Sequence, residues 1–218
     1  MGKKRLEDAI KQVDHPVEVT YRCFELDPTM GRDIKENMYE ALAKKYGMSI
    51  AQAKANTERM TQMAKDAGLE YHFDTLILTN TFDAHRLTML AKKQGLMQEM
   101  TERLLRAYFT ESKHIGNHET LTQLAVEVGL EREAVEKMLA SDEMADAVRA
   151  DEAVARQYQI NSVPFFLINK KYAVTGAQPI EVFVQALRKV IAEDEIVVLG
   201  DADNGVVCDE NGCELPKK

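Results

Sequence analysis

Two cysteines near the C-terminal end of this 218-residue chain offer the clearest redox chemistry in the sequence. Cys208 and Cys213 enclose Asp-Glu-Asn-Gly, and the Asn-Gly pair allows the chain to reverse so that the two sulfur atoms can meet. A ring this small gains only about 2 kcal/mol from closure in the chain-entropy model, so the pair is a poor structural staple. We interpret Cys208 and Cys213 as a redox-active dithiol, and two incidental thiols on a tail are the alternative. A zinc site would need a second pair of ligands that the cysteine spacing does not supply.

The other candidate side chains carry weaker signals. Cys23 alternates onto the apolar face of its segment, which is typical of a small buried hydrophobe. His85 lies near the start of a predicted helix, where a lone histidine is usually packed or capping. His114 and His118 are four residues apart, but a Gly-Asn pair interrupts that helix and no third ligand is evident. We therefore expect no metal site.

A proline marks the beginning of a predicted buried strand. Pro164 follows Val163 and precedes FFLI, a position at which proline cannot join a hydrogen-bonded ladder. Only about 5–6% of X-Pro bonds are cis, so this position alone does not justify predicting a cis bond.

The composition excludes several classes of protein. The chain carries 36 acidic and 28 basic residues, a net charge of −8, which argues against a nucleic-acid binder. No apolar stretch approaches the length needed to span a bilayer, and the N-terminus has no apolar signal region. Three cysteines are too few for a disulfide scaffold. We expect a cytoplasmic globular protein without membrane partners.

The elements that must position these side chains begin with a helix and a strand. Apolar residues at helical spacing over residues 6–13 predict a helix, which His15-Pro16 ends. Residues 17–26, VEVTYRCFEL, alternate and predict a strand.

From about residue 32 to residue 159 the chain has the pattern of a helical bundle. Ser49 with Gln52 forms a capping box, and we expect Ser141 to cap the last helix. The predicted helices cover residues 50–67, 81–95, 97–110, 119–128, 132–139 and 142–158.

After residue 159 the pattern returns to strands. VPFFLIN and KKYAVTG predict two strands joined by a tight turn at Asn169-Lys170, and Pro179 opens a helix to about Ala192. IVVLG and GVV predict a small terminal hairpin. The layout is a small α/β core split by an all-helical insertion.

Several motifs, in order, resemble the DsbA-like thioredoxin superfamily, and most closely its FrnE-type cytoplasmic branch. They are GKKRLEDAI, VEVTYRCFELDP, NTFDAHRL, SVPFFLIN, VTGAQP and CDENGC. The resemblance implies an α/β thioredoxin-like core from residues 1–30 and 160–195, a helical insertion over 31–159, and a C-terminal hairpin and CX4C tail over 196–218. It also implies a cis bond between Val163 and Pro164, with both residues beside the substrate.

The family places a strand and a Cys-x-x-Cys motif ahead of its first helix, and this sequence begins at the residue that follows the motif. We expect a protein thiol–disulfide oxidoreductase or isomerase that needs no cofactor, is weak or inactive without that motif, and can form a homodimer. Cys208 and Cys213 are then the remaining catalytic dithiol. The alternatives are an enzyme like glutathione transferase kappa or 2-hydroxychromene-2-carboxylate isomerase, and a non-catalytic module that binds polypeptides.

The resemblance also predicts a defect in the sheet. The family's first strand lies between the strand expected at residues 17–26 and the strand after Pro164. Without it we expect a gap, a strand from another molecule, or a non-native pairing, because buried backbone groups need partners.

Overall fold

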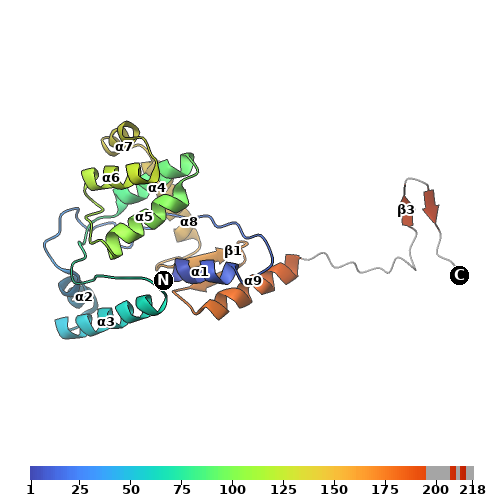
Figure 1. Cartoon of the computed structure of the whole chain (residues 1–218), viewed down its shortest axis with the longest axis horizontal. Coiled ribbons are helices and arrows are strands. Elements are labelled where there is room, and N and C mark those ends of the chain that lie inside the picture. Colours follow the sequence, from blue (N-terminus) through green and yellow to red (C-terminus); the bar gives the residue numbers. More distant parts are fainter. Residues whose placement is uncertain (195–206, 210–211, 215–218) are drawn as a thin grey trace.

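The computed structural model describes residues 1–194 and two short strands, residues 207–209 and 212–214 (Figure 1). Helices account for about half of the described residues. The helices are α1 (Gly2–Ile10), α2 (Met38–Tyr46), α3 (Ile50–Asp66), α4 (Phe82–Lys93), α5 (Met97–Phe109), α6 (His118–Val128), α7 (Arg132–Leu139), α8 (Ala145–Gln157) and α9 (Ile180–Asp194). The expected α/β fold with a helical insertion is what the structure has.

The helical block is organised around α4. Seven consecutive or near-consecutive residues of α4 are buried, from Ala84 to Ala91, because α5, α6, α7 and α8 all pack against this helix. Leu87, Met100, Leu121 and Met138 are fully buried in the shared apolar core. In Figure 1 these helices form one group above the α/β part.

The α/β part consists of one hairpin with α1 and α9 packed on it. Strand β1 (Phe165–Ile168) pairs antiparallel with β2 (Tyr172–Thr175). Residues 169–171 connect them. Asn169 and Lys170, with φ angles of 47° and 55°, are the central residues of a turn that the Lys171 backbone nitrogen closes by donating to the Ile168 carbonyl at 3.0 Å. The turn predicted at this dipeptide is confirmed. Phe183 of α9 is fully buried, and its ring centroid lies 4.8 Å from that of Phe166.

The strand predicted over residues 17–26 is wrong, because these residues belong to no strand in the structure. Among the described residues, the sheet at this position contains only β1 and β2. Burial in this segment still follows the alternation, although its residues pair with no strand: Cys23 and Glu25 are buried, whereas Arg22 and Leu26 are exposed.

The sequence predicts N-caps for two helices, and the structure contains one of them. Ser49 and Gln52 form the predicted capping box of α3. Ser141, in contrast, does not cap α8, which begins after Met144. The Ser141 hydroxyl instead accepts a hydrogen bond from the Glu143 backbone nitrogen at 3.2 Å, in a turn that precedes the helix.

Near the C-terminus, β3 (Val207–Asp209) pairs antiparallel with β4 (Gly212–Glu214), and Cys208 is the register partner of Cys213. The hairpin predicted from IVVLG and GVV lies, except for Val207, outside the described residues.

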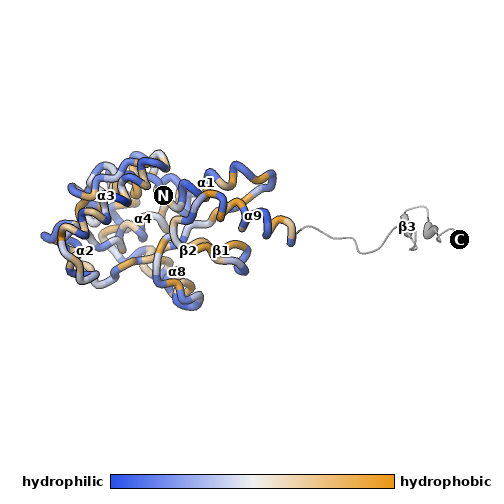
Figure 2. The backbone as a smooth tube through the Cα atoms, turned by 90° about the horizontal axis from the view of Figure 1, so that it is seen from below, coloured by the Kyte–Doolittle hydropathy of each residue, from blue (hydrophilic) through white to orange (hydrophobic). Residues whose placement is uncertain are grey.

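Figure 2 shows hydrophilic and hydrophobic residues intermixed along the helices. None of the helices in residues 1–194 combines the length and the apolar character needed to cross a membrane.

Candidate redox site

The first turn of α1 lies directly against the loop that carries Pro164. Gly2 is buried there, and a Cβ atom placed on it would lie 2.7 Å from Pro164 Cγ and 3.1 Å from Phe166 Cζ. Such a contact is too short for any side chain, so glycine lets the helix approach the loop closely. The peptide bond between Val163 and Pro164 is cis, the geometry expected from the resemblance.

A guanidinium clamp holds this contact together from the side. Arg5 donates hydrogen bonds from Nη1 to the carbonyl oxygens of Ala177 and Gln178, the latter at 3.3 Å. The Gly176 backbone nitrogen in turn donates to the Pro164 carbonyl at 2.8 Å. The helix, the proline loop and the turn after β2 therefore form one connected unit.

The two amino groups at this end of α1 both have partners within the protein. The Met1 ammonium donates to the Tyr71 hydroxyl at 2.9 Å, and burial lowers its pKa. The Lys3 ammonium contacts Glu7 at 2.6 Å and Glu102 at 2.5 Å. Although burial opposes it, these hydrogen bonds hold the pKa of Lys3 above its ordinary value. Free backbone N–H groups at a helix N-terminus favour an anionic group such as a thiolate.

The predicted site residues fall into two groups. Val163, 43% exposed, and Pro164 lie at the α1 terminus, where a polypeptide can reach them. Cys208 and Cys213 lie opposite each other in the register of the C-terminal hairpin. Directly opposed residues of an antiparallel pair have Cα atoms about 4.5–5.5 Å apart, within the range that a disulfide spans.

Cys23 is the buried hydrophobe that its alternation predicted. It is 2% exposed, packs with Met89 and Val148, and its Sγ lies 3.6 Å from Thr88 Oγ1. Burial raises the pKa of this thiol to about 11, so it holds its proton at neutral pH and is a poor nucleophile.

The NTFDAHRL motif has a structural role in this fold. Arg86 is 4% exposed and donates to the carbonyl oxygens of Met138 at 2.5 Å and Glu143 at 2.9 Å, and also to that of Ser141. Its Nη1 donates to Asp83 at 2.8 Å. Arg86 thereby ties α4 to the end of α7 and to the connection that leads into α8.

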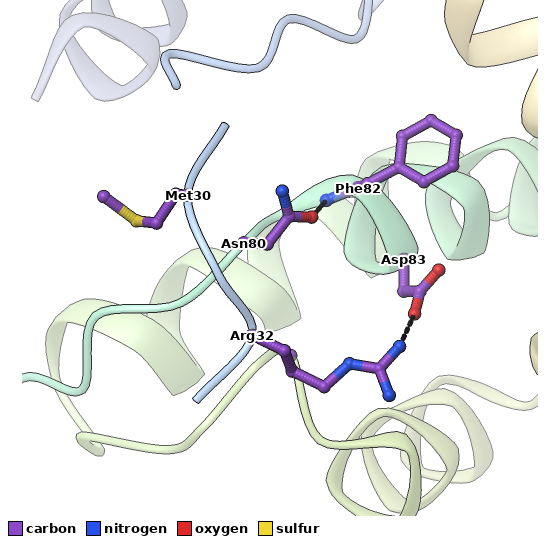
Figure 3. Close-up of a pocket in the computed structure, with 6 residues that line it drawn as sticks. Met30, Arg32, Asn80, Phe82 and Asp83 are labelled. Carbon is purple, nitrogen blue, oxygen red and sulfur yellow. Dashed lines mark hydrogen bonds and ion pairs between the residues drawn. The ribbon is translucent and has the colours of Figure 1, made fainter. Parts of the chain in front are cut away.

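A cavity of about 290 Å³ lies beside this motif (Figure 3). Its polar groups already have partners: Arg32 pairs with Asp83 at 2.8 Å, and the Asn80 side-chain oxygen accepts from the Phe82 backbone nitrogen at 2.8 Å. The lining residues are Met30, Arg32, Asn80, Phe82, Asp83 and Gly116.

The two histidines considered as metal ligands each contact a different carboxylate. His118 Nε2 is 2.7 Å from Asp83, and His114 Nε2 is 3.3 Å from Asp33. Within residues 1–194, no group of three potential ligands is arranged to hold a metal ion.

Sequence reasoning missed two features. GKKR and VTGAQ supported the resemblance, but the clamp from Arg5 to the turn after β2 was not predicted. A buried pair of glutamates, Glu25 and Glu152, was also missed. The sequence did contain a signal for Glu25, because side chains two residues apart in an alternating segment share a face, and this places Glu25 on the same face as Cys23.

Comparison with known proteins agrees with this geometry. The family described as "DSBA-like thioredoxin domain" matches residues 1–188. The chain is similar to the probable DsbA oxidoreductase SCO1869 from Streptomyces coelicolor, with 39% identity and a TM-score of 0.86 over 99% of this chain and 93% of that one. It is also 28% identical over 201 residues to the uncharacterized protein YwbO of Bacillus subtilis (strain 168), covering 86% of this chain and 88% of the relative. The chain belongs to the DSBA-like thioredoxin domain family.

Proposed function

We propose that this protein is a thiol–disulfide oxidoreductase that acts on cysteines of polypeptide substrates. The observation that carries the proposal is the close contact of Gly2 with Pro164, which joins the N-terminus of α1 to an accessible loop. Val163 and Pro164 would bind the substrate chain by backbone contacts to an extended segment. The family assignment supports the reaction class.

In this proposal Cys208 and Cys213 supply the dithiol of the chain. One thiolate attacks a substrate disulfide, forms a mixed disulfide and releases one substrate thiolate. The second cysteine then attacks the mixed disulfide and releases the other substrate thiolate. The substrate gains two electrons, Cys208 and Cys213 become a disulfide, and a small-molecule or protein thiol restores them.

Acidic residues close to Cys208 and Cys213 in the sequence should slow the attack of these thiols on a disulfide. Asp209, Glu210 and Glu214 accompany the two cysteines in the sequence. Nearby carboxylates disfavour a thiolate and raise the pKa of a thiol. We therefore assign the pair a secondary role, in relaying electrons or sensing oxidants. A cytoplasmic location, no cofactor and no nucleic-acid or membrane partner fit this role, and a homodimer remains part of the proposal.

Reduction of insulin by dithiothreitol tests the proposal. We expect weak catalysis by the chain, lost when Cys208→Ser and Cys213→Ser are combined and retained in the matched control Cys23→Ser. A Cys-x-x-Cys segment joined ahead of α1 should raise the rate strongly, and the double substitution should then lower it only partly. Full activity of the 218-residue chain, abolished by the double substitution, would make the tail the principal catalytic centre.

The same assay separates the alternatives. A glutathione-dependent enzyme such as a 2-hydroxychromene-2-carboxylate isomerase would bind glutathione and leave insulin intact. A binding module would retain unfolded polypeptide without reducing it, whether or not its cysteines are replaced.

A further inference from the structure

The turn after β2, residues 175–178, holds the proline loop at the open end of the hairpin. The Gly176 backbone nitrogen donates to the Pro164 carbonyl at 2.8 Å, and this bond extends the ladder one residue beyond the register pairs of β1 with β2. Gly176 has a φ angle of 76°, a conformation that favours glycine. The Gln178 side chain donates to the Thr175 carbonyl at 2.8 Å, and its backbone nitrogen donates to the Gly176 carbonyl at 3.0 Å. The turn therefore has a defined shape, and it determines where the Pro164 carbonyl lies.

Arg5 connects this turn to α1. Its Nη1 atom donates to the carbonyl oxygens of Ala177 and Gln178. Within residues 1–194, no other side chain of α1 hydrogen-bonds to the turn. Gly2 supplies the second contact, since it lies against the Pro164 ring. Two contacts from one helix therefore set the orientation of the proline loop, one at the ring and one through the turn.

The main chain of Val163 is what this loop offers to a ligand. Pro164 has no N–H group, and its carbonyl already accepts from Gly176. Val163 is 43% exposed, and in the part of the chain that the structure describes neither its backbone nitrogen nor its carbonyl oxygen takes part in a hydrogen bond. Hydrogen bonds weaken steeply when donor and acceptor are misaligned, so the direction of these two groups determines how well an extended polypeptide binds.

We propose that Arg5 is a positioning residue for polypeptide binding. Arg5 holds the turn against α1, the turn holds the Pro164 carbonyl, and the backbone of Val163 is thereby fixed in the direction that a substrate chain needs. This inference rests on the proposed function, because the ligand is the polypeptide substrate. Without Arg5 the contact at Gly2 remains, but the turn loses its side-chain tie to the helix and the loop takes up more orientations.

Binding of the S-methylated B chain of insulin tests the proposal, because methylated cysteines cannot exchange disulfides and binding is measured alone. Titration followed at the Val163 amide by nitrogen-15 NMR gives the Kd of the folded protein, which a general loss of stability does not change while the protein stays folded. For Arg5→Ala we expect a Kd about tenfold higher, since misaligned groups lose roughly one hydrogen bond. Arg5→Lys should lie between, because its shorter side chain with a single nitrogen reaches the turn less well.

The matched control is Lys4→Ala, which removes the same charge from the neighbouring position of α1. Lys4 pairs with Asp8 at 2.7 Å and makes no hydrogen bond to the turn. Its loss should therefore leave the Kd within about twofold of the unmodified value. An equal rise in Kd for the two alanine variants, or no rise for Arg5→Ala, would overturn the proposal.

Nitrogen-15 relaxation of the free protein measures the loop separately from binding. We expect the order parameter of the Val163 N–H to be near the rigid value of about 0.85 in the unmodified protein and in Lys4→Ala, and to fall toward about 0.6 in Arg5→Ala. If the unmodified protein does not bind the peptide, the proposed function fails, and these order parameters still decide whether Arg5 positions the loop. Equal values in the two alanine variants would overturn the inference. If Arg5→Ala does not fold, an unchanged Kd and order parameter in Arg5→Lys would overturn it.

Discussion

Replacing Arg86 by alanine should cost more stability than replacing any exposed arginine. The side chain is 5% exposed and holds the carbonyl oxygens of Met138, Ser141 and Glu143 together with the Asp83 carboxylate. Hydrogen bonds to a charged group contribute about 1.5–3 kcal/mol each, and breaking a buried ion pair costs about 3–5 kcal/mol. Because the connection can relax and admit water, we expect a loss of about 3–5 kcal/mol. For a chain of this size, that lowers the Tm by roughly 6–20 °C.

The control is Arg132→Ala. Arg132 is 48% exposed and pairs with Glu119 at 3.6 Å and Glu136 at 3.1 Å, so its loss should cost under about 1 kcal/mol. Thermal unfolding followed by circular dichroism compares the two variants, and Arg86→Lys should fall between them because an ammonium lacks the planar set of donors. Equal melting temperatures for the alanine variants would refute the structural role assigned to Arg86. If Arg86→Ala does not fold, the lysine variant still decides the question.

Three further outcomes follow from the structure. Gly2→Ala should lower the free energy of unfolding in urea by about 1–3 kcal/mol, because the added Cβ meets the Pro164 ring. In the control Gly31→Ala the added Cβ meets open space, and the free energy of unfolding should change by no more than about 0.5 kcal/mol. Equal losses in the two variants would contradict the close contact. A thiol reagent should modify Cys23 only on unfolding, and labelling of Cys23 at the same rate in the folded and the urea-unfolded protein would contradict its burial. Burial opposes ionisation of Asp83, but hydrogen bonds from His118 and Arg86 hold its pKa below the ordinary 3.8. The unmodified protein should therefore be more stable than Asp83→Asn to urea above pH 3.8, and this difference should vanish as the pH falls through the folded pKa of Asp83. A stability difference that does not depend on pH would contradict this.

Local patterns predicted most of the helices. The capping box at Ser49 and the spacing of apolar residues in the block specify structure within a few residues of each position, and α3 through α7 lie close to their expected ranges. The hairpin turn at Asn169 follows in the same way from dipeptide chemistry. Ser141 shows the limit of such reasoning, because a serine can close a turn as readily as it caps a helix.

Long-range contacts were harder to predict. Residues 17–26 have the alternation of a strand, but a strand also needs a neighbour, and the sequence of one segment does not contain that information. The contact of Gly2 with Pro164 joins positions 162 residues apart and has no local signal except the glycine itself. The division into residues 1–30 with 160–195, 31–159 and 196–218 remains a proposal, and the packing of Cys23 on Met89 and Val148 shows that its first segment also contacts the helical block.

The open side of β1 has a consequence for handling the protein in solution. Within the described part of the chain β1 pairs along one edge only, with β2, and an unpaired strand edge is a template for intermolecular pairing and aggregation. Leu167 is 38% exposed on this strand, whereas Lys170 and Lys171 place charge at the end of the hairpin. Such lysines act as gatekeepers, because bringing two copies edge to edge would bring their charges together. We therefore expect the tendency to aggregate to increase with ionic strength, since salt screens this repulsion.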